Sequence, residues 1–330
     1  MNKVRKATVI GDGGWGTALA LVLQRNGHDV TVWGYDEEVV EGIKARHENH
    51  YYLPGIPLPP EINWTSDKAA ATEDSDIFVI AVPSKFYEGV MSSFKGLLKP
   101  EHHIVSVSKG LRNDQRLSTI AEKALDHPAI AALSGPSHAE EVAKGVPSAV
   151  VVACKEAERA EVLQEAFNGN GFRVYSSDDI IGVEIGGAMK NVIAIAAGVS
   201  DGIGYGDNTK AALITRGLTE IVRLGTAVGG KPQTFYGLSG MGDLIVTCAS
   251  KHSRNRGFGE RLGRGETREE IAASMRMVAE GVWNAETAWH LAQKLNLDLP
   301  ITHEVFKVLY EDKDPTQAVI DLLSRDPKPE

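Results

Sequence analysis

The sequence predicts an α/β N-terminal domain with a doubly wound, Rossmann-like parallel sheet, followed by an all-α C-terminal domain. In the first half of the chain, short apolar runs alternate with segments of helical composition, as in a parallel sheet that helices cover on both faces. From about Val183 onward, apolar residues recur at helical spacing instead, for example in residues 210–229 and 281–296. We therefore expect one domain over residues 1–182 and a second over residues 183–330.

The elements of the first half follow one another in a regular order. The first predicted strand ends at the glycines that begin at residue 11, and a helix from Ala18 ends near Gly27, which suits a C-cap. A second strand follows at residues 29–34. Residues 51–60 contain too many prolines for regular structure, so we expect a surface loop there. Further strands are predicted at residues 76–83, 103–110, 129–136 and 148–154.

The composition excludes several classes of protein. The 330 residues carry a formal net charge of -9, which argues against nucleic-acid binding because nucleic-acid-binding proteins show a basic patch or stripe. An anionic substrate remains open, since an acidic protein can hold a local cationic pocket. Cys154 and Cys248 lie far apart without metal-type spacing, and no histidine motif for a metal occurs. We expect no disulfide, no metal and a reducing compartment.

The chain shows no sign of a targeting or membrane segment. Its N-terminal apolar run covers only residues 7–10, which is too short for a signal peptide. No uninterrupted run approaches the roughly 18 apolar residues of a membrane span. We therefore expect a cytoplasmic protein without membrane insertion.

A glycine-rich turn predicts a dinucleotide site. Residues 11–16 read G-x-G-x-x-G, follow a predicted strand and open a predicted helix. In that setting the first glycine makes the tight turn, the second lets the backbone approach a pyrophosphate, and the third allows helix and strand to pack closely. The motif alone is weak, because glycine-rich turns also occur for structural reasons. Its position between strand and helix favours binding of NAD(H) or NADP(H).

The choice between these two cofactors stays open. An NAD site usually carries Asp or Glu at the end of the second strand, where it holds the ribose hydroxyls. Here Gly34 and Tyr35 occupy that place, and Asp36 comes slightly late. No arginine is present to bind a 2′-phosphate either. We expect both cofactors to be usable, with a slight preference for NADP(H).

Six segments stand out along the chain: PSKFYEGV from residue 83, SKGL from residue 108, LSGPSHAEEV from residue 133, GAMKNVIAIAAGVSDGIGYGDN from residue 187, GLSGMGDLIVTCASKHSRNRGFGERLGRG from residue 237 and VAEGV from residue 278. Together they resemble NAD(P)-dependent glycerol-3-phosphate dehydrogenases of the bacterial type. The resemblance covers nearly the whole chain in the right order, with one departure: Tyr35 stands where many members carry a basic residue. It implies interconversion of dihydroxyacetone phosphate and sn-glycerol 3-phosphate by hydride transfer with NAD(P)H, supplying glycerol 3-phosphate for phospholipids.

Lys190 is the predicted catalytic residue. It stands at the head of an apolar, small-residue segment, where a lysine could simply extend its ammonium into water. A densely packed helix would instead leave it in an enclosed space, where desolvation lowers the pKa of the amine. Such a lysine can exchange a proton with the C2 oxygen of the substrate. The family resemblance implies this same role of proton acceptor and donor.

The remaining site residues come mainly from the resemblance. Lys109 follows an apolar strand, at the sheet edge where ligands bind in open α/β folds. Arg254 offers a planar donor fork that suits a phosphate. Asp243 either orients the Lys190 ammonium or caps a helix, and Thr247 is an auxiliary donor. The predicted substrate-binding residues are Lys109, Gly135, Ser137, Lys190, Asn191, Asp243, Ser253, Arg254 and Asn255. The predicted cofactor-binding residues are Gly11, Gly13, Gly14, Trp15, Gly16, Tyr35, Lys109, Ala139, Arg254, Val278 and Glu280.

Two other functions compete with this interpretation. A related two-domain NAD(P)-dependent dehydrogenase of a β-hydroxy acid would also use a lysine near the domain boundary, but a carboxylate substrate would not require residues 253–255. A cofactor-sensing protein without catalysis would keep the glycine turn and have no need of Lys190, Asp243 and Arg254 together. The expected partner is a small phosphorylated triose. A homodimer is possible, because helical second domains of such enzymes often pair.

Overall fold

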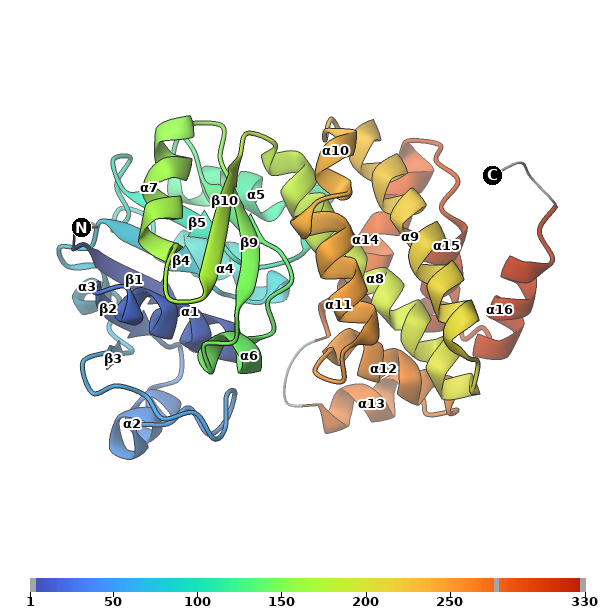
Figure 1. Ribbon diagram of the computed structural model, residues 1–330, viewed down its shortest axis with the longest axis horizontal. Helices are drawn as coiled ribbons and strands as arrows, with labels where there is room; N and C mark the ends of the chain where they lie inside the picture. Colours follow the sequence, from blue (N-terminus) through green and yellow to red (C-terminus); the bar gives the residue numbers. More distant parts are fainter. Residues whose placement is uncertain (1–3, 276–278, 327–330) are drawn as a thin grey trace. The chain divides into compact units, whose positions relative to one another are not determined.

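The computed structural model describes residues 4–275 and 279–326 and divides into two compact units (Figure 1). Unit 1 comprises residues 1–109 and 115–184, and unit 2 comprises residues 110–114 and 185–330. Residues 110–114 therefore belong to unit 2, and the chain then continues in unit 1. The division after residue 184 lies inside one helix, α8 (Ile180–Ile203).

Unit 1 is built on an eight-stranded sheet with the order β10-β9-β8-β5-β4-β1-β2-β3. The run from β8 to β3 is the strand order of a doubly wound dinucleotide-binding fold. The strands are β1 (Lys6–Ile10), β2 (Asp29–Trp33), β3 (Asn63–Thr65), β4 (Ile77–Ile80), β5 (His103–Ser106), β8 (Ala131–Ser134), β9 (Ser148–Ala153) and β10 (Phe172–Ser177), and two short strands, β6 (Leu111–Arg112) and β7 (Gln115–Arg116), lie outside this sheet.

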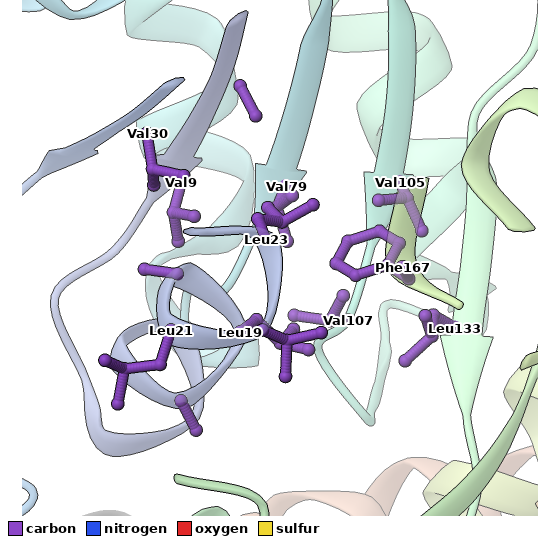
Figure 2. Close-up of a cluster of buried hydrophobic side chains, with 14 of the residues drawn as sticks. Val9, Leu19, Leu21, Leu23, Val30, Val79, Val105, Val107, Leu133 and Phe167 are labelled. Atoms are coloured by element: carbon purple, nitrogen blue, oxygen red, sulfur yellow. The ribbon is translucent and has the colours of Figure 1, made fainter. Parts of the chain in front are cut away.

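Helices cover both faces of the sheet. Buried residues of α1 and α7 pack on one face, where Leu19, Leu23 and Phe167 meet Val79 and Val105 of the central strands (Figure 2). Residues of α4 and α5 form a separate core on the other face. The helices of unit 1 are α1 (Gly14–Arg25), α2 (Glu37–Arg46), α3 (Lys68–Thr72), α4 (Tyr87–Ser93), α5 (Leu117–Leu125), α6 (Ala139–Ala143) and α7 (Ala157–Phe167), with a 3-10 turn at Ser84–Phe86.

Unit 2 is helical, and α8 contributes its central, almost wholly buried element. The predicted fold class, a Rossmann-like domain followed by a helical one, is thus confirmed. The other helices are α9 (Asp207–Ala227), α10 (Pro232–Phe235), α11 (Asp243–Ala249), α12 (Arg254–Gly263), α13 (Arg268–Ser274), α14 (Glu280–Lys294), α15 (Pro300–Tyr310) and α16 (Pro315–Leu323), with a π-helical turn at Leu238–Gly242.

The helix α8 is long and apolar enough to cross a membrane by length and composition alone. It contains no uninterrupted apolar run of that length, because Glu184, Lys190 and Asp201 lie within it. In the structure 94% of its most apolar window is buried inside the protein, as in the core helix of a globular fold.

Several details differ from the sequence prediction. The sheet is not wholly parallel, because β8 and β9 are antiparallel, with Leu133 opposite Val152. The two edge strands β3 and β10 were not predicted: β3 has only three residues, and β10 alternates buried and exposed residues and lacks a continuous apolar run. Residues 51–60 do not form a simple surface loop, since Leu53, Ile56 and Leu58 are buried in the core of unit 1.

Candidate active site

The glycine-rich turn joins β1 to α1 and leaves the start of α1 open. Gly11 has a φ of 117°, and a Cβ there would lie 2.5 Å from the carbonyl oxygen of Ala81. A Cβ on Gly16 would lie 2.1 Å from the carbonyl oxygen of Gly11, so the third glycine lets helix and turn touch. Among the described residues, nothing lies within 4 Å of a Cβ on Gly13, the N-cap of α1, and no side chain caps this helix. Open space over an uncapped helix N-terminus fits a pyrophosphate.

Other predicted cofactor residues of unit 1 lie in or beside the turn, or shortly after β2. The Nε1 of Trp15 is buried, and no acceptor in the described part of the chain receives its hydrogen. Ala139 begins α6, and its Cβ lies 3.9 Å from where a Cβ of Gly14 would be. Tyr35 follows β2 and is 83% exposed, with its ring edge-to-face to that of Trp33. An unpaired indole donor and an exposed aromatic ring suit a dinucleotide, so these residues fit the group.

Lys109, Gly135 and Ser137 come together in unit 1. The carbonyl oxygen of Gly135 accepts hydrogen bonds from Lys109 Nζ at 3.0 Å and from Ser137 Oγ at 2.8 Å. Gly135 has a φ of 148°, and a Cβ there would lie 2.8 Å from Val150 Cα, so only glycine fits. Lys109 and Gly135 follow the neighbouring parallel strands β5 and β8, whose carboxyl ends share one edge of the sheet. Ligands of open α/β sheets bind at this edge.

Lys190 lies in the buried middle of α8, with only 6% of the residue exposed. Its Nζ donates to Asp243 Oδ1 at 2.5 Å and to Thr247 Oγ1 at 2.8 Å. Thr247 Oγ1 in turn donates to the carbonyl oxygen of Asp243 at 2.6 Å. Burial disfavours a charged ammonium and the neighbouring carboxylate favours it, so the two influences oppose each other. This buried ion pair corresponds to the predicted role of Asp243 in orienting Lys190, and Asp243 also begins α11.

A π-helical turn, Leu238–Gly242, positions Asp243. A Cβ on Gly186 would lie 2.7 Å from the carbonyl oxygen of Ser239, so the small residues at the head of α8 allow this turn to approach closely. Single π-helical turns are rare and occur often at functional sites. No sequence pattern indicated this turn.

A chain of side-chain amides continues from the residue next to Lys190. Asn191 Oδ1 accepts from Asn255 Nδ2 at 2.9 Å, and Asn255 Oδ1 accepts from the backbone N–H of Gly281 at 2.8 Å. Asn191 Nδ2 donates to the carbonyl oxygen of Gly187 at 3.3 Å. The two asparagines therefore connect α8, α12 and the first turn of α14. The sequence predicted them as substrate donors and did not reveal that they bind each other.

The segment 253–255 forms the start of α12. Ser253 is its N-cap and accepts from the backbone N–H of Arg256 at 3.2 Å. Arg254 is the first residue of the helix and is exposed. Asn255 faces inward toward α8, as described above. A helix N-terminus and an exposed guanidinium provide donors and positive potential for an anion.

Close contacts between α8 and α12 hold this segment in place. A Cβ on Gly198 would lie 2.0 Å from the carbonyl oxygen of Arg256, and one on Gly259 would lie 2.0 Å from that of Ile195. In addition, Arg256 Nε donates to Asp201 Oδ2 at 2.7 Å. The glycines and the ion pair fix the distance between the helix of Lys190 and the helix of Arg254.

Of the two remaining predicted cofactor residues, Glu280 begins α14, next to Gly281. Val278 lies outside the described residues. Asn284, a fully buried residue of α14, was not predicted from the sequence. It donates to the carbonyl oxygen of Ala188 and accepts from the backbone N–H of Leu111, each at 3.1 Å.

No metal site is visible in the described part of the chain, where no group of three or more His, Cys, Asp or Glu side chains converges. Both cysteines are free and buried. Burial raises the pKa of the Cys248 thiol to about 12, so this side chain stays protonated in the core.

Comparison with known proteins gives a consistent result. Models of the N-terminal and C-terminal parts of NAD-dependent glycerol-3-phosphate dehydrogenase match residues 6–160 and 179–320. A glycerol-3-phosphate dehydrogenase [NAD(P)+] of Fusobacterium nucleatum is 50% identical over 98% of both chains. One from Bacillus pumilus is 48% identical over 98% of this chain and 95% of its own. The crystal structure of glycerol-3-phosphate dehydrogenase from Coxiella burnetii superposes with a TM-score of 0.94 at 41% identity, covering 98% of this chain and 99% of that one.

Proposed function

The chain belongs to the NAD-dependent glycerol-3-phosphate dehydrogenase family, and from this premise we propose which of its residues carry the reaction. It is an oxidoreductase that interconverts dihydroxyacetone phosphate and sn-glycerol 3-phosphate with NAD(P)H. The alternative of a β-hydroxy acid dehydrogenase is not favoured, since relatives about half identical over the whole chain are glycerol-3-phosphate dehydrogenases. A sensor without catalysis is likewise not favoured.

Lys190 is the proton carrier of the reaction. When bound, the reduced nicotinamide supplies the hydride that converts the C2 carbonyl carbon to an alcohol carbon. The C2 oxygen must gain a proton in the same conversion, and the Lys190 ammonium donates it. In the reverse direction the amine takes the proton back from the hydroxyl. The observation that carries this assignment is the contact of Lys190 Nζ with Asp243 and Thr247. These two hydrogen bonds fix the orientation of the ammonium while the residue stays buried.

Arg254 and the first turn of α12 bind the phosphate of the substrate. The exposed guanidinium can donate two hydrogen bonds to phosphate oxygens, and the helix N-terminus adds positive potential. The Ser253 oxygen accepts the hydrogen bond that caps the helix, so its hydroxyl hydrogen can donate to the phosphate. Asn255 mainly positions this turn, because its amide oxygen and one of its amide hydrogens already bond Gly281 and Asn191.

Unit 1 binds the dinucleotide through the turn at residues 11–16 and the start of α1. The open space at Gly13 and the unpaired Trp15 indole support this assignment. Lys109 and Ser137, joined at the Gly135 carbonyl, would fix the backbone of that loop and offer polar hydrogens to ligand groups at the sheet edge. Unit 2 is then the substrate-binding domain.

We also propose that the enzyme works in the cytoplasm, where its product would supply glycerol 3-phosphate for phospholipids. A homodimer is the assembly we expect from the helical second unit. Light scattering on the purified protein measures the assembly directly.

One assay tests the proposed activity. NADH or NADPH oxidation should proceed rapidly with dihydroxyacetone phosphate and slowly with unphosphorylated dihydroxyacetone. Equal turnover of both compounds would contradict the phosphate-binding role of α12, and no turnover of either would contradict the proposed reaction.

A further inference from the structure

The end of β2 lacks the acidic residue that usually selects NAD(H). In Rossmann-like domains this residue holds the hydroxyls of the adenosine ribose, and an arginine nearby accommodates the 2′-phosphate of NADP(H). Here β2 ends at Trp33, and the next residue is Gly34. The sequence therefore left the cofactor preference open, with a slight preference for NADP(H).

The space beside Gly34 is filled by another side chain. A Cβ on Gly34 would lie 2.9 Å from Asp12 Oδ2 and 3.0 Å from Asp12 Cγ. It would also lie 2.6 Å from Val40 Cγ2. A side chain on residue 34 would therefore displace Asp12 or Val40, because the carboxylate of Asp12 lies close to where that side chain would begin. Asp12 is the second residue of the glycine-rich turn, so this carboxylate reaches the end of β2 from the neighbouring strand's loop.

The backbone of Asp12 is firmly held. Its carbonyl oxygen accepts from Asn49 Nδ2 at 2.7 Å, and Asn49 is fully buried. The preceding residue, Gly11, donates its N–H to the carbonyl oxygen of Trp33 at 2.9 Å, which ties the turn to the last residue of β2. The fold therefore sets the backbone position from which the Asp12 carboxylate extends.

The surroundings of the carboxylate are acidic. Burial raises the pKa of Asp12, its own backbone amide lowers it, and the charge of Asp36 raises it again. Burial also raises the pKa of Tyr52, and Asp12 and Asp36 raise it further. Among the described residues no side chain donates a hydrogen bond to the Asp12 carboxylate. Such a carboxylate gains from two hydroxyl donors, and it repels a phosphate.

We propose that Asp12 supplies the ribose-binding carboxylate that the end of β2 lacks, and that it makes this enzyme prefer NAD(H) to NADP(H). The inference rests on the proposed function, because it concerns the cofactor of that reaction. It reverses the slight preference for NADP(H) that was expected from residues 34–36 alone. Asp36 strengthens the selection as a second negative charge that would face a 2′-phosphate.

Cofactor binding without substrate tests this assignment independently of turnover. The dissociation constants of NADH and NADPH are measured by quenching of tryptophan fluorescence, for the wild type and for Asp12→Asn and Asp12→Ala. We expect the wild type to bind NADH about tenfold or more tightly than NADPH, since hydrogen bonds to a charged group are worth about this factor. Both variants should lose most of this ratio, through weaker NADH binding and equal or tighter NADPH binding.

A matched control is Asp29→Asn, which removes an exposed carboxylate from the opposite end of β2. It should leave the NADH-to-NADPH ratio unchanged, and the melting temperatures of all variants establish that they are folded. Tighter binding of NADPH than NADH by the wild type, or an unchanged ratio in folded Asp12→Asn, overturns the assignment of Asp12. Failure of the wild type to bind either nucleotide would instead overturn the proposed cofactor site itself.

Discussion

Lys190 and Asp243 form a buried ion pair, with 2.5 Å between Nζ and Oδ1. The exposed fractions of the two side chains are only 7% and 1%. Removal of one partner from a buried pair leaves an uncompensated charge, so each residue constrains what can replace the other. The same contact orients the ammonium, and this makes the pair the centre of the proposed proton transfer.

Lys190→Ala should lower kcat by about 10²–10⁴-fold, the usual contribution of a positioned proton donor. Lys190→Arg should remain nearly as inactive, because arginine keeps the positive charge but does not readily release a proton. NADH binding, measured by fluorescence, should survive in both variants, since the glycine-rich turn belongs to unit 1. Wild-type kcat in folded Lys190→Ala would refute the proton-transfer role.

Arg254→Ala should raise KM for dihydroxyacetone phosphate about tenfold or more, because a hydrogen bond to a charged group contributes about 1.5–3 kcal/mol. Turnover of unphosphorylated dihydroxyacetone should change little. Arg264→Ala is the control: this arginine ends the same helix and pairs with Glu260 at the surface. An exposed ion pair contributes little, so KM should stay near the wild-type value there. Equal effects of the two substitutions would remove Arg254 from the phosphate site.

Gly259→Ala should destabilise the protein by about 1–3 kcal/mol, as expected for overpacking, because its Cβ would collide with the Ile195 carbonyl. The forced separation of α8 and α12 should also raise KM for the phosphorylated substrate. Gly257→Ala lies on the same helix, where nothing among the described residues comes within 4 Å of the new methyl group. It should stabilise the protein by about 0.5–1 kcal/mol. Thermal melts and KM values of both variants test this contrast.

Glu220 makes part of the stability depend on pH. Its carboxylate accepts from the backbone N–H groups of Ile301 and Thr302, at 2.5 and 3.0 Å, at the start of α15. Burial raises the pKa of Glu220 from 4.5 to about 7, so the folded state favours the protonated form. The stability from this group is full below about pH 4.5 and is lost as the pH rises through about 7, a change of about 3 kcal/mol.

Urea unfolding of the wild type and of Glu220→Gln between pH 4.5 and 8 measures this effect. As the pH rises, the free energy of unfolding of the wild type should fall relative to that of Glu220→Gln. Glu311→Gln, at the other end of α15, removes an exposed carboxylate and should give a curve parallel to that of the wild type. Parallel curves for Glu220→Gln would contradict the assignment.

Local patterns in the sequence carried most of the fold. Continuous apolar runs identified β4, β5, β8 and β9, and the small residues around Lys190 identified a buried helix. The strand β10 escaped because one of its faces is exposed, so its residues alternate. The turn at residues 11–16 was found because its function requires glycine at fixed spacing.

Such local patterns did not predict contacts between residues that are distant in the sequence. The carboxylate of Asp12 fills the space beside Gly34, 22 positions later in the numbering of the chain, and nothing in either segment signals this. Asn255 was predicted as a free substrate donor, yet Asn191 and Gly281 occupy most of its hydrogen-bonding capacity. Such assignments depend on which helices meet, and only the three-dimensional structure provides that.

Residues 110–114 belong to unit 2, although the residues before and after them belong to unit 1. This affects how the protein can be divided or recombined. Leu111 is buried, and its N–H satisfies the amide oxygen of Asn284 on α14. A fragment beginning at Ile185 would lack that donor and the apolar cover, so a single cut cannot release an intact helical unit. Chimaeras of related enzymes joined at residue 184 would inherit mismatched partners unless residues 110–114 were exchanged together with 185–330. An exchange of the helical unit between related enzymes must therefore include these five residues, which lie far upstream in the gene.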